Sequence, residues 1–244
     1  MKQLQDFFTK LKIYGPSKIL SFIVSELKMK FYYGAIKQSY SQKQEDLFID
    51  KFFKGKKSGF YVDVGANNPD RFSNTKKFYL NGWKGINIEP DVSNYNKFVI
   101  RRKKDINLNI GIGLKKGKLK FFKFMPDTLS TFSSEEAKRY IKLGHPLENE
   151  LDIEVKPLSM VLQEHCKNKV IDFISIDTEG FDMQVLMSNN WKLYNPTLIC
   201  IESVEYEINS KKKATNVNND IFLNKKGYKK IYDNGLNSIY KVNS

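Results

Sequence analysis

The stretch FYVDVGANNPDRFSNTKKFYLNGWKGINIE, from Phe60 to Glu89, contains two strand-like runs separated by a helical one. FYVDV predicts a buried strand because it is apolar and β-branched, and Gly65 ends it. SNTKKFYLNG predicts a helix that ends at Gly82, and KGINIE predicts a second strand. A strand–helix–strand unit of this length is typical of a right-handed crossover in a parallel sheet.

The alternation of strands and helices continues along most of the chain. Further strands are predicted at residues 105–113, 118–124, 151–156, 170–177 and 196–202, and helices at residues 91–103, 134–143, 157–165 and 181–188. Residues 228–242 instead predict a hairpin whose turn contains Asn234 and Gly235. We therefore predict an α/β fold with a mostly parallel sheet and an antiparallel C-terminal hairpin.

Residues 1–56 predict an N-terminal helical extension to a domain that spans residues 57–244. Pro16 interrupts a first amphipathic piece, and Ser17 can cap a second one. In the second piece apolar residues recur at helical spacing, namely Ile19, Leu20, Ile23, Val24 and Leu27. We favour packing of this stripe on the core or on a second subunit of a homodimer. Peripheral contact with a membrane surface is the alternative, because lysines and aromatic residues accompany the stripe.

The chain has 244 residues, enough for one domain with a real core, and a formal net charge of +14. Such a charge attracts anions such as nucleic acid, anionic lipid or acidic polysaccharide. However, the basic residues are scattered in short clusters that are typical of a solvated surface, such as Arg101–Lys104 and Lys211–Lys213. Cys166 and Cys200 show no metal-type spacing, and no signal peptide is recognisable. These features predict a cytoplasmic protein with two free thiols.

The turn after the first strand predicts a nucleoside cofactor. In open α/β sheets, ligands bind beyond the carboxyl ends of the strands. There Gly65 allows close approach of the backbone, small Ala66 keeps that approach open, Asp63 suits an ammonium group, and Glu89 suits a ribose diol. A single glycine is too few for the pyrophosphate-binding GxGxxG pattern, and no P-loop occurs. S-adenosylmethionine, with a ribose and an amino-acid tail but no phosphate, fits best.

The chain resembles the FkbM-type methyltransferase family over about residues 40–205. The resemblance is carried by YSQKQEDLFIDKFF, by YVDVGANNPDRFSNTKKFYLNGWKGINIEPD, by DINLNIGIG and by FISIDTEGFDMQVL, which occur in the family's order. It implies a class I methyltransferase (Rossmann-like) fold, with residues 57–244 as the catalytic domain. It also implies transfer of a methyl group from S-adenosylmethionine to a hydroxyl of a sugar, glycan or other small metabolite. Many relatives have a glycine where this chain has Asn68-Pro69-Asp70.

The same resemblance implies which residues bind the cofactor. The methionine end would be lined by Asp63, Gly65, Ala66 and Asn67. The ribose would be bound by Glu89, and the adenine would be flanked by Pro90, Asp91, Asn107, Leu108, Asn109 and Ile110. Ser73 and Thr75 either cap the following helix or bind the cofactor carboxylate.

Three carboxylates lie at or just after the end of the strand at residues 170–177. Methyl transfer to a hydroxyl requires alignment of the reacting atoms and removal of a proton. Asp177 is the first candidate for a group near the methyl, Glu179 for a base or acceptor-binding group, and Asp182 for a helix cap. His145 is a further candidate base. A divalent metal held by Asp177, Glu179 and Glu202 is an alternative that we do not expect, because no histidine completes the set.

Two other functions compete with this one. The net charge of +14 would suit an RNA methyltransferase, but no Asn-Pro-Pro-Tyr motif for a flipped base occurs, so we do not expect a nucleic-acid partner. A non-catalytic scaffold docked by its N-terminal helices is the other alternative. Asp63, Glu89 and Asp177 argue against it, because a scaffold needs no carboxylates at the strand ends.

Overall fold

The computed structural model describes residues 38–167, 169–206, 213–215 and 217–243, and in the N-terminal segment residues 15–17, 20, 24 and 27. Most of the predicted N-terminal extension therefore lies outside the described residues. Leu20, Val24 and Leu27 of its apolar stripe are described and are exposed, so the predicted packing of the stripe on the core is wrong for these three residues. Packing of the stripe on a second subunit or on a membrane stays a prediction. Among the described residues, no helix is both long and apolar enough to cross a membrane.

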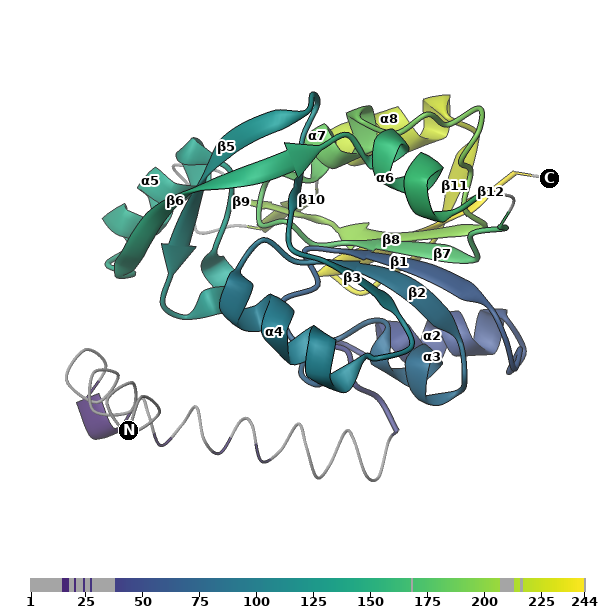
Figure 1. Ribbon diagram of the computed structural model, residues 1–244, viewed down its shortest axis with the longest axis horizontal. Helices are drawn as coiled ribbons and strands as arrows, with labels where there is room; N and C mark the ends of the chain where they lie inside the picture. Colours follow the sequence, from purple (N-terminus) through teal and green to yellow (C-terminus); the bar gives the residue numbers. More distant parts are fainter. Residues whose placement is uncertain are drawn as a thin grey trace.

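The main sheet has seven strands in the order β11-β12-β8-β7-β1-β2-β3 (Figure 1). Their bounds are Phe60–Val64 for β1, Lys84–Ile88 for β2, Ile106–Leu108 for β3, Phe173–Ile176 for β7, Leu198–Glu202 for β8, Tyr228–Asp233 for β11 and Asn237–Val242 for β12. Neighbouring strands from β3 to β8 pair in parallel, whereas β12 pairs antiparallel with both β8 and β11. The predicted mostly parallel sheet and antiparallel C-terminal hairpin are confirmed.

Helices cover both faces of this sheet (Figure 1). On one side lie α2 (Glu45–Phe52), α3 (Lys76–Leu80) and α4 (Val92–Arg101), and on the other α6 (Leu158–His165), α7 (Asp182–Met187) and α8 (Val217–Lys225). Successive residues of a strand point to opposite faces. In β1, Val62 and Val64 accordingly join one apolar cluster and Tyr61 joins the other.

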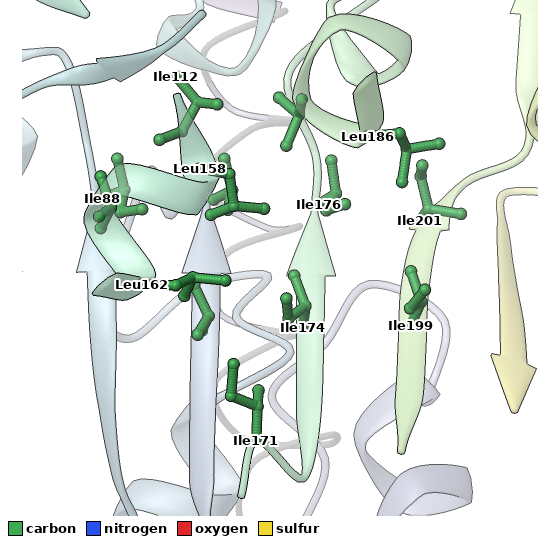
Figure 2. Packing of buried hydrophobic residues seen from close by; sticks show 14 of the residues in the cluster. Ile88, Ile112, Leu158, Leu162, Ile171, Ile174, Ile176, Leu186, Ile199 and Ile201 are labelled. Carbon is green, nitrogen blue, oxygen red and sulfur yellow. The ribbon is translucent and has the colours of Figure 1, made fainter. Parts of the chain in front are cut away.

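The larger apolar cluster packs the sheet against α6 and α7. Figure 2 shows Leu158 of α6 and Leu186 of α7 packed against isoleucines of neighbouring strands. Among these are Ile88, Ile174 and Ile199. On the opposite face Ile49 of α2 and Phe78 of α3 pack with Trp83 and Phe173. The C-terminal end of the predicted extension thus shares the core of the sheet. The division at residue 56 itself stays a prediction.

A second sheet is inserted between β3 and α6. It contains β4 (Gly111–Ile112), β5 (Gly117–Phe124) and β6 (Leu147–Lys156) in the order β4-β6-β5. The short helices η2 (Asp127–Leu129) and α5 (Ser134–Lys142) connect β5 to β6. We call residues 111–156 the inserted unit.

Two strands predicted from the sequence have different bounds in the structure, because they take part in the inserted unit. The strand predicted at residues 105–113 is two strands, because its first half pairs with β2 whereas Gly111 and Ile112 pair with β6 in the other sheet. The strand predicted at residues 151–156 begins earlier, at Leu147, because β5 provides a pairing partner along its whole length.

Arg102 also departs from the sequence analysis, which placed it in a solvated basic cluster. Its side chain is buried, and its guanidinium donates to Tyr61 Oη at 3.0 Å, Pro69 O at 2.8 Å and Ser73 Oγ at 3.1 Å. The buried carboxylate of Asp105 lies 4.0 Å from the same guanidinium. Arg102 thereby joins β1 to the loop that leads into α3, and its charge is compensated inside the protein.

Loss of the Arg102 charge should therefore cost far more stability than loss of the neighbouring Arg101 charge. We expect Arg102→Met to lower the free energy of unfolding by about 3–5 kcal/mol, because it leaves Asp105 buried without its cation. Arg101 pairs with Asp70 in an exposed salt bridge, so Arg101→Met should cost at most about 1 kcal/mol. Urea denaturation of both variants measures the difference, and equal losses would contradict the role assigned to Arg102.

Candidate active site

A cavity of about 420 Å³ lies at the carboxyl ends of β1, β2, β7 and β8, with the inserted unit forming part of its wall. Most of the residues predicted from the sequence line it. These are Asp63, Gly65, Ala66, Asn67, Ser73, Glu89, Pro90, Asp91, His145, Asp177 and Glu179. The predicted strand-end carboxylates are thus brought together around one space.

The turn after β1 is closely packed against the backbone of two neighbouring strands. Gly65 has a φ of 75°, and its N–H and that of Ala66 both donate to Ile88 O, at 3.0 and 3.1 Å. Asp177 N donates to Val64 O at 3.0 Å. A Cβ on Gly65 would lie only 1.9 Å from Asp177 O. Gly65 was predicted to allow close approach of a ligand. The structure also requires a glycine there because the backbone of Asp177 lies so close.

Replacing this glycine should be far more harmful than replacing one with the same backbone angle in open space. Gly235 also has a φ of 75°, and a Cβ there meets nothing within 4 Å. Gly235→Ala should cost about 1–2 kcal/mol of unfolding free energy, which is the backbone strain alone. Gly65→Ala adds the overlap with Asp177 O and should cost clearly more. Similar losses for the two variants in urea denaturation would show that this contact is unimportant.

Glu89 links the turn after β1 to the loop after β2. Its carboxylate is buried, and it accepts Asn67 N at 2.7 Å and Asp91 N at 2.8 Å. Burial raises the pKa of Glu89 to about 8, although these two hydrogen bonds act in the opposite direction. Each carboxylate oxygen has further acceptor capacity, so Glu89 can still accept hydrogen bonds from a diol.

The residues predicted to flank the adenine after β3 separate into two groups. Ile110 lines the cavity. Asn107, Leu108 and Asn109 are not part of its lining. Asn109 instead donates to Glu89 O at 2.8 Å, Asn107 donates to Arg102 O at 3.2 Å, and Leu108 packs on the core. Of these three side chains, that of Asn109 supports the cavity wall, because it holds the backbone of Glu89.

Ser73 and Thr75 both make hydrogen bonds within the protein. Ser73 Oγ accepts Lys76 N, the first N–H of α3, at 3.2 Å, but the N-cap residue is Thr75, whose side chain makes no capping hydrogen bond. Thr75 Oγ1 donates to Asp63 Oδ2 at 2.7 Å. Burial raises the pKa of Asp63 to about 6, against the effect of this hydrogen bond and of the Arg102 charge. Ser73 and Asp63 line the cavity, so the hydrogen bond from Lys76 does not remove Ser73 from it.

Three carboxylates at the carboxyl ends of β7 and β8 face the cavity: Asp177, Glu179 and Glu202. Burial and the charges of Asp182 and Asp63 raise the pKa of Asp177 to about 7, although its side chain is open to the cavity. The carboxylates of Asp177 and Glu202 accept no hydrogen bond from a described residue. Burial and neighbouring carboxylates raise the pKa of Glu202 well above its usual value.

Asp182 has a structural role in this region. It is the first residue of α7, and its carboxylate accepts hydrogen bonds from both the N–H and the hydroxyl of Thr178. It therefore closes the turn that leads into α7. The predicted capping role is wrong, because Phe181 is the N-cap residue of α7 and no side chain makes a capping hydrogen bond there. In the described part of the chain, no group of three or more His, Cys, Asp or Glu side chains is placed to hold a metal ion.

Sequence reasoning missed several residues of the inserted unit that line the cavity, among them Phe121, Asp127, Phe132, Arg139 and Tyr140. Their positions depend on how the second sheet folds over the first, which no local pattern reveals. His145 was the candidate that the sequence analysis named in this region, and it lies beside the Tyr140 ring. Thr131 Oγ1 of the inserted unit donates to Glu179 O at 2.8 Å.

Comparison with known proteins shows the family of the chain. The model of the methyltransferase FkbM domain matches residues 63–230, well over half of the chain. The protein therefore belongs to the FkbM methyltransferase family, and its seven-stranded sheet has the class I methyltransferase fold. No curated protein matches. A solved structure from Klebsiella pneumoniae, provisionally assigned as an O-methyltransferase, is similar at 11% identity and a TM-score of 0.39. That alignment covers 99% of this chain and 97% of the other, but likeness at this level carries no argument.

The raised pKa of Glu89 makes stability depend on pH. The folded protein binds a proton at Glu89 up to about pH 8, whereas the unfolded chain releases it near pH 4.5. The stability contributed by this proton is therefore lost as the pH rises through that window. Between pH 6 and pH 8 we expect it to lower the unfolding free energy by about 2 kcal/mol. Glu89→Gln should remove this part of the pH dependence in urea denaturation, and an unchanged dependence would contradict the shift.

Proposed function

We propose that this methyltransferase is an S-adenosylmethionine-dependent enzyme that methylates a hydroxyl group of a sugar, glycan or other small metabolite. One observation carries the proposal: the strand-end wall of the cavity is acidic, although the chain as a whole has a net charge of +14. Asp63, Glu89, Asp177 and Glu202 all contribute to that wall. Carboxylates suit a cofactor that carries a sulfonium and an ammonium group and no phosphate.

The residues present fit such a cofactor in three respects. Glu89 presents a carboxylate with spare acceptor capacity at the end of β2, where a ribose diol binds in related folds. The turn at Gly65 offers close backbone approach without the additional glycines that a pyrophosphate needs. Asp63, held by Thr75, supplies a buried negative charge at the end of β1 for an ammonium group.

When bound, S-adenosylmethionine supplies an electrophilic methyl group. The protein has to align the acceptor oxygen with that group, accept the hydroxyl proton and keep water away. Glu179 and Glu202 can accept hydrogen bonds from acceptor hydroxyls. Phe132 places an apolar ring in the cavity wall between Phe121 and Phe181, with ring centroids at 4.8 and 5.8 Å, and thereby limits access of water.

The acidic wall also restricts which kinds of molecule can be the methyl acceptor. Buried carboxylates would repel the phosphates of a nucleic acid, so the charge of the surface does not make RNA the favoured acceptor. A neutral or cationic molecule with several hydroxyl groups is compatible with Glu179 and Glu202. The cytoplasmic location, the homodimer and the contact with a membrane stay predictions from the sequence.

Calorimetric titration with S-adenosylmethionine tests the cofactor assignment directly. At pH 8.5, above the raised pKa of Glu89, we expect binding to the wild-type protein, and a loss of affinity of about 10- to 100-fold in Glu89→Gln, because hydrogen bonds from the ribose to a charged acceptor are lost. Glu150→Gln is the matched control, since Glu150 is exposed on β6 and pairs with Lys120. Absence of binding to the wild type, or equal affinities for Glu89→Gln and Glu150→Gln, would contradict the proposal.

A further inference from the structure

Tyr140 of α5 reaches from the inserted unit to the loop after β7. Its hydroxyl donates to Glu179 Oε2 at 2.8 Å, and both residues line the cavity. The Tyr140 ring is buried in the small core of the inserted unit, edge-on to Phe124 at 5.6 Å, and the Arg139 guanidinium lies 4.5 Å from its centroid. Packing therefore fixes the position of the hydroxyl that Glu179 meets.

The backbone of Glu179 is also held in an unusual state. Its φ is 50°, in the left-handed region that non-glycine residues seldom adopt, and the next residue, Gly180, has a φ of 85°. Thr131 Oγ1 donates to Glu179 O, and a Cβ on Gly180 would lie 2.5 Å from Glu136 Cγ. Strain of this kind persists where the surroundings hold it, and it concentrates at functional sites. Here the inserted unit holds both the backbone and the side chain of Glu179.

The charges around Glu179 explain why a hydroxyl donor matters there. Burial raises its pKa, and so do the carboxylates that face it: Asp177 at the end of β7, Asp182 of α7 and Glu136 of α5. Glu202 of β8 faces the same group. Glu136 is partly compensated by Arg139, whose Nε lies 2.7 Å from its carboxylate. The Tyr140 hydrogen bond acts in the opposite direction and favours the charged form of Glu179.

We propose that Tyr140 is a positioning residue for Glu179, and that Glu179 Oε1 takes the proton of the acceptor hydroxyl. This inference rests on the proposed function. Oε2 is occupied by Tyr140, whereas Oε1 accepts no hydrogen bond from a described residue. As the acceptor oxygen forms its bond to the methyl carbon, the carbon–sulfur bond breaks, and its electron pair stays on sulfur. The hydroxyl proton passes to Oε1, and Glu179 afterwards releases it to water.

Two cofactor analogues test this role without a known acceptor. S-adenosylhomocysteine lacks the methyl group, and sinefungin has a protonated amine at that position. If Glu179 faces the methyl position in its charged form, the wild type should bind sinefungin more tightly than S-adenosylhomocysteine in calorimetry at pH 7. Tyr140→Phe should reduce sinefungin affinity about tenfold, which corresponds to an upward shift of one pKa unit, and change S-adenosylhomocysteine affinity less than about twofold. Glu179→Gln should have the same effect, and the double variant no larger one.

A second measurement does not depend on any ligand. In protein labelled at the glutamate carboxyl carbons, the NMR signal that is absent from Glu179→Gln belongs to Glu179. Its titration midpoint should move to higher pH in Tyr140→Phe. Tyr228→Phe is the matched control, because it removes another buried hydroxyl with a 2.8 Å hydrogen bond, to Pro196 O, away from the cavity. It should change neither the midpoint nor the ratio of the two affinities.

The outcomes separate the two proposals. If the wild type binds both analogues but Tyr140→Phe leaves their affinity ratio and the Glu179 midpoint unchanged, the role of Tyr140 is wrong and the proposed function stands. Equal weakening of both analogues would show that Tyr140 only supports the structure. If the wild type binds neither analogue, the proposed function is wrong, and the inference is overturned with it.

Discussion

The contact between Gly65 and the backbone of Asp177 is the constraint on which the rest of the site depends. Three strand ends meet there, because Ile88 O accepts the N–H groups of Gly65 and Ala66 and Val64 O accepts that of Asp177. No side chain larger than hydrogen fits between them at residue 65. The parallel register of β1 with β2 and β7 thus brings Asp63, Glu89 and Asp177 to one edge of the sheet.

The inserted unit completes the site from above this edge, and polar contacts join it to both sides of the cavity. On the side of β2, Lys123 lies 2.7 Å from Asp91, and Asp127 accepts Asn94 Nδ2 at 3.2 Å. On the side of β7, Tyr140 and Thr131 hold Glu179. The two sides of the cavity, which we propose bind the nucleoside and the acceptor, are therefore connected through the inserted unit.

The sequence was informative where local chemistry determines structure. The apolar strands, the break at Gly65, the carboxylates at strand ends and the hairpin at Asn234 all follow from short patterns, and the structure has them. The remaining features depend on which strands pair with each other in the folded protein. Whether residues 105–113 form one strand or two depends on a partner strand far along the chain.

The sequence also did not show which polar side chains are buried. Arg102 looks like its basic neighbours, but Tyr61, Ser73 and Asp105 surround it. The same limit applies to the cavity wall. Phe132 and Tyr140 carry no recognisable motif, and they become part of the site because the inserted unit folds against the loop after β7.

The most direct test is a crystal structure of the protein with S-adenosylhomocysteine bound. The account predicts that the ribose hydroxyls donate to Glu89 and that the sulfur lies on the side of the cavity formed by Asp177 and Glu179. A nucleoside bound elsewhere, or one whose ribose does not contact Glu89, would contradict it.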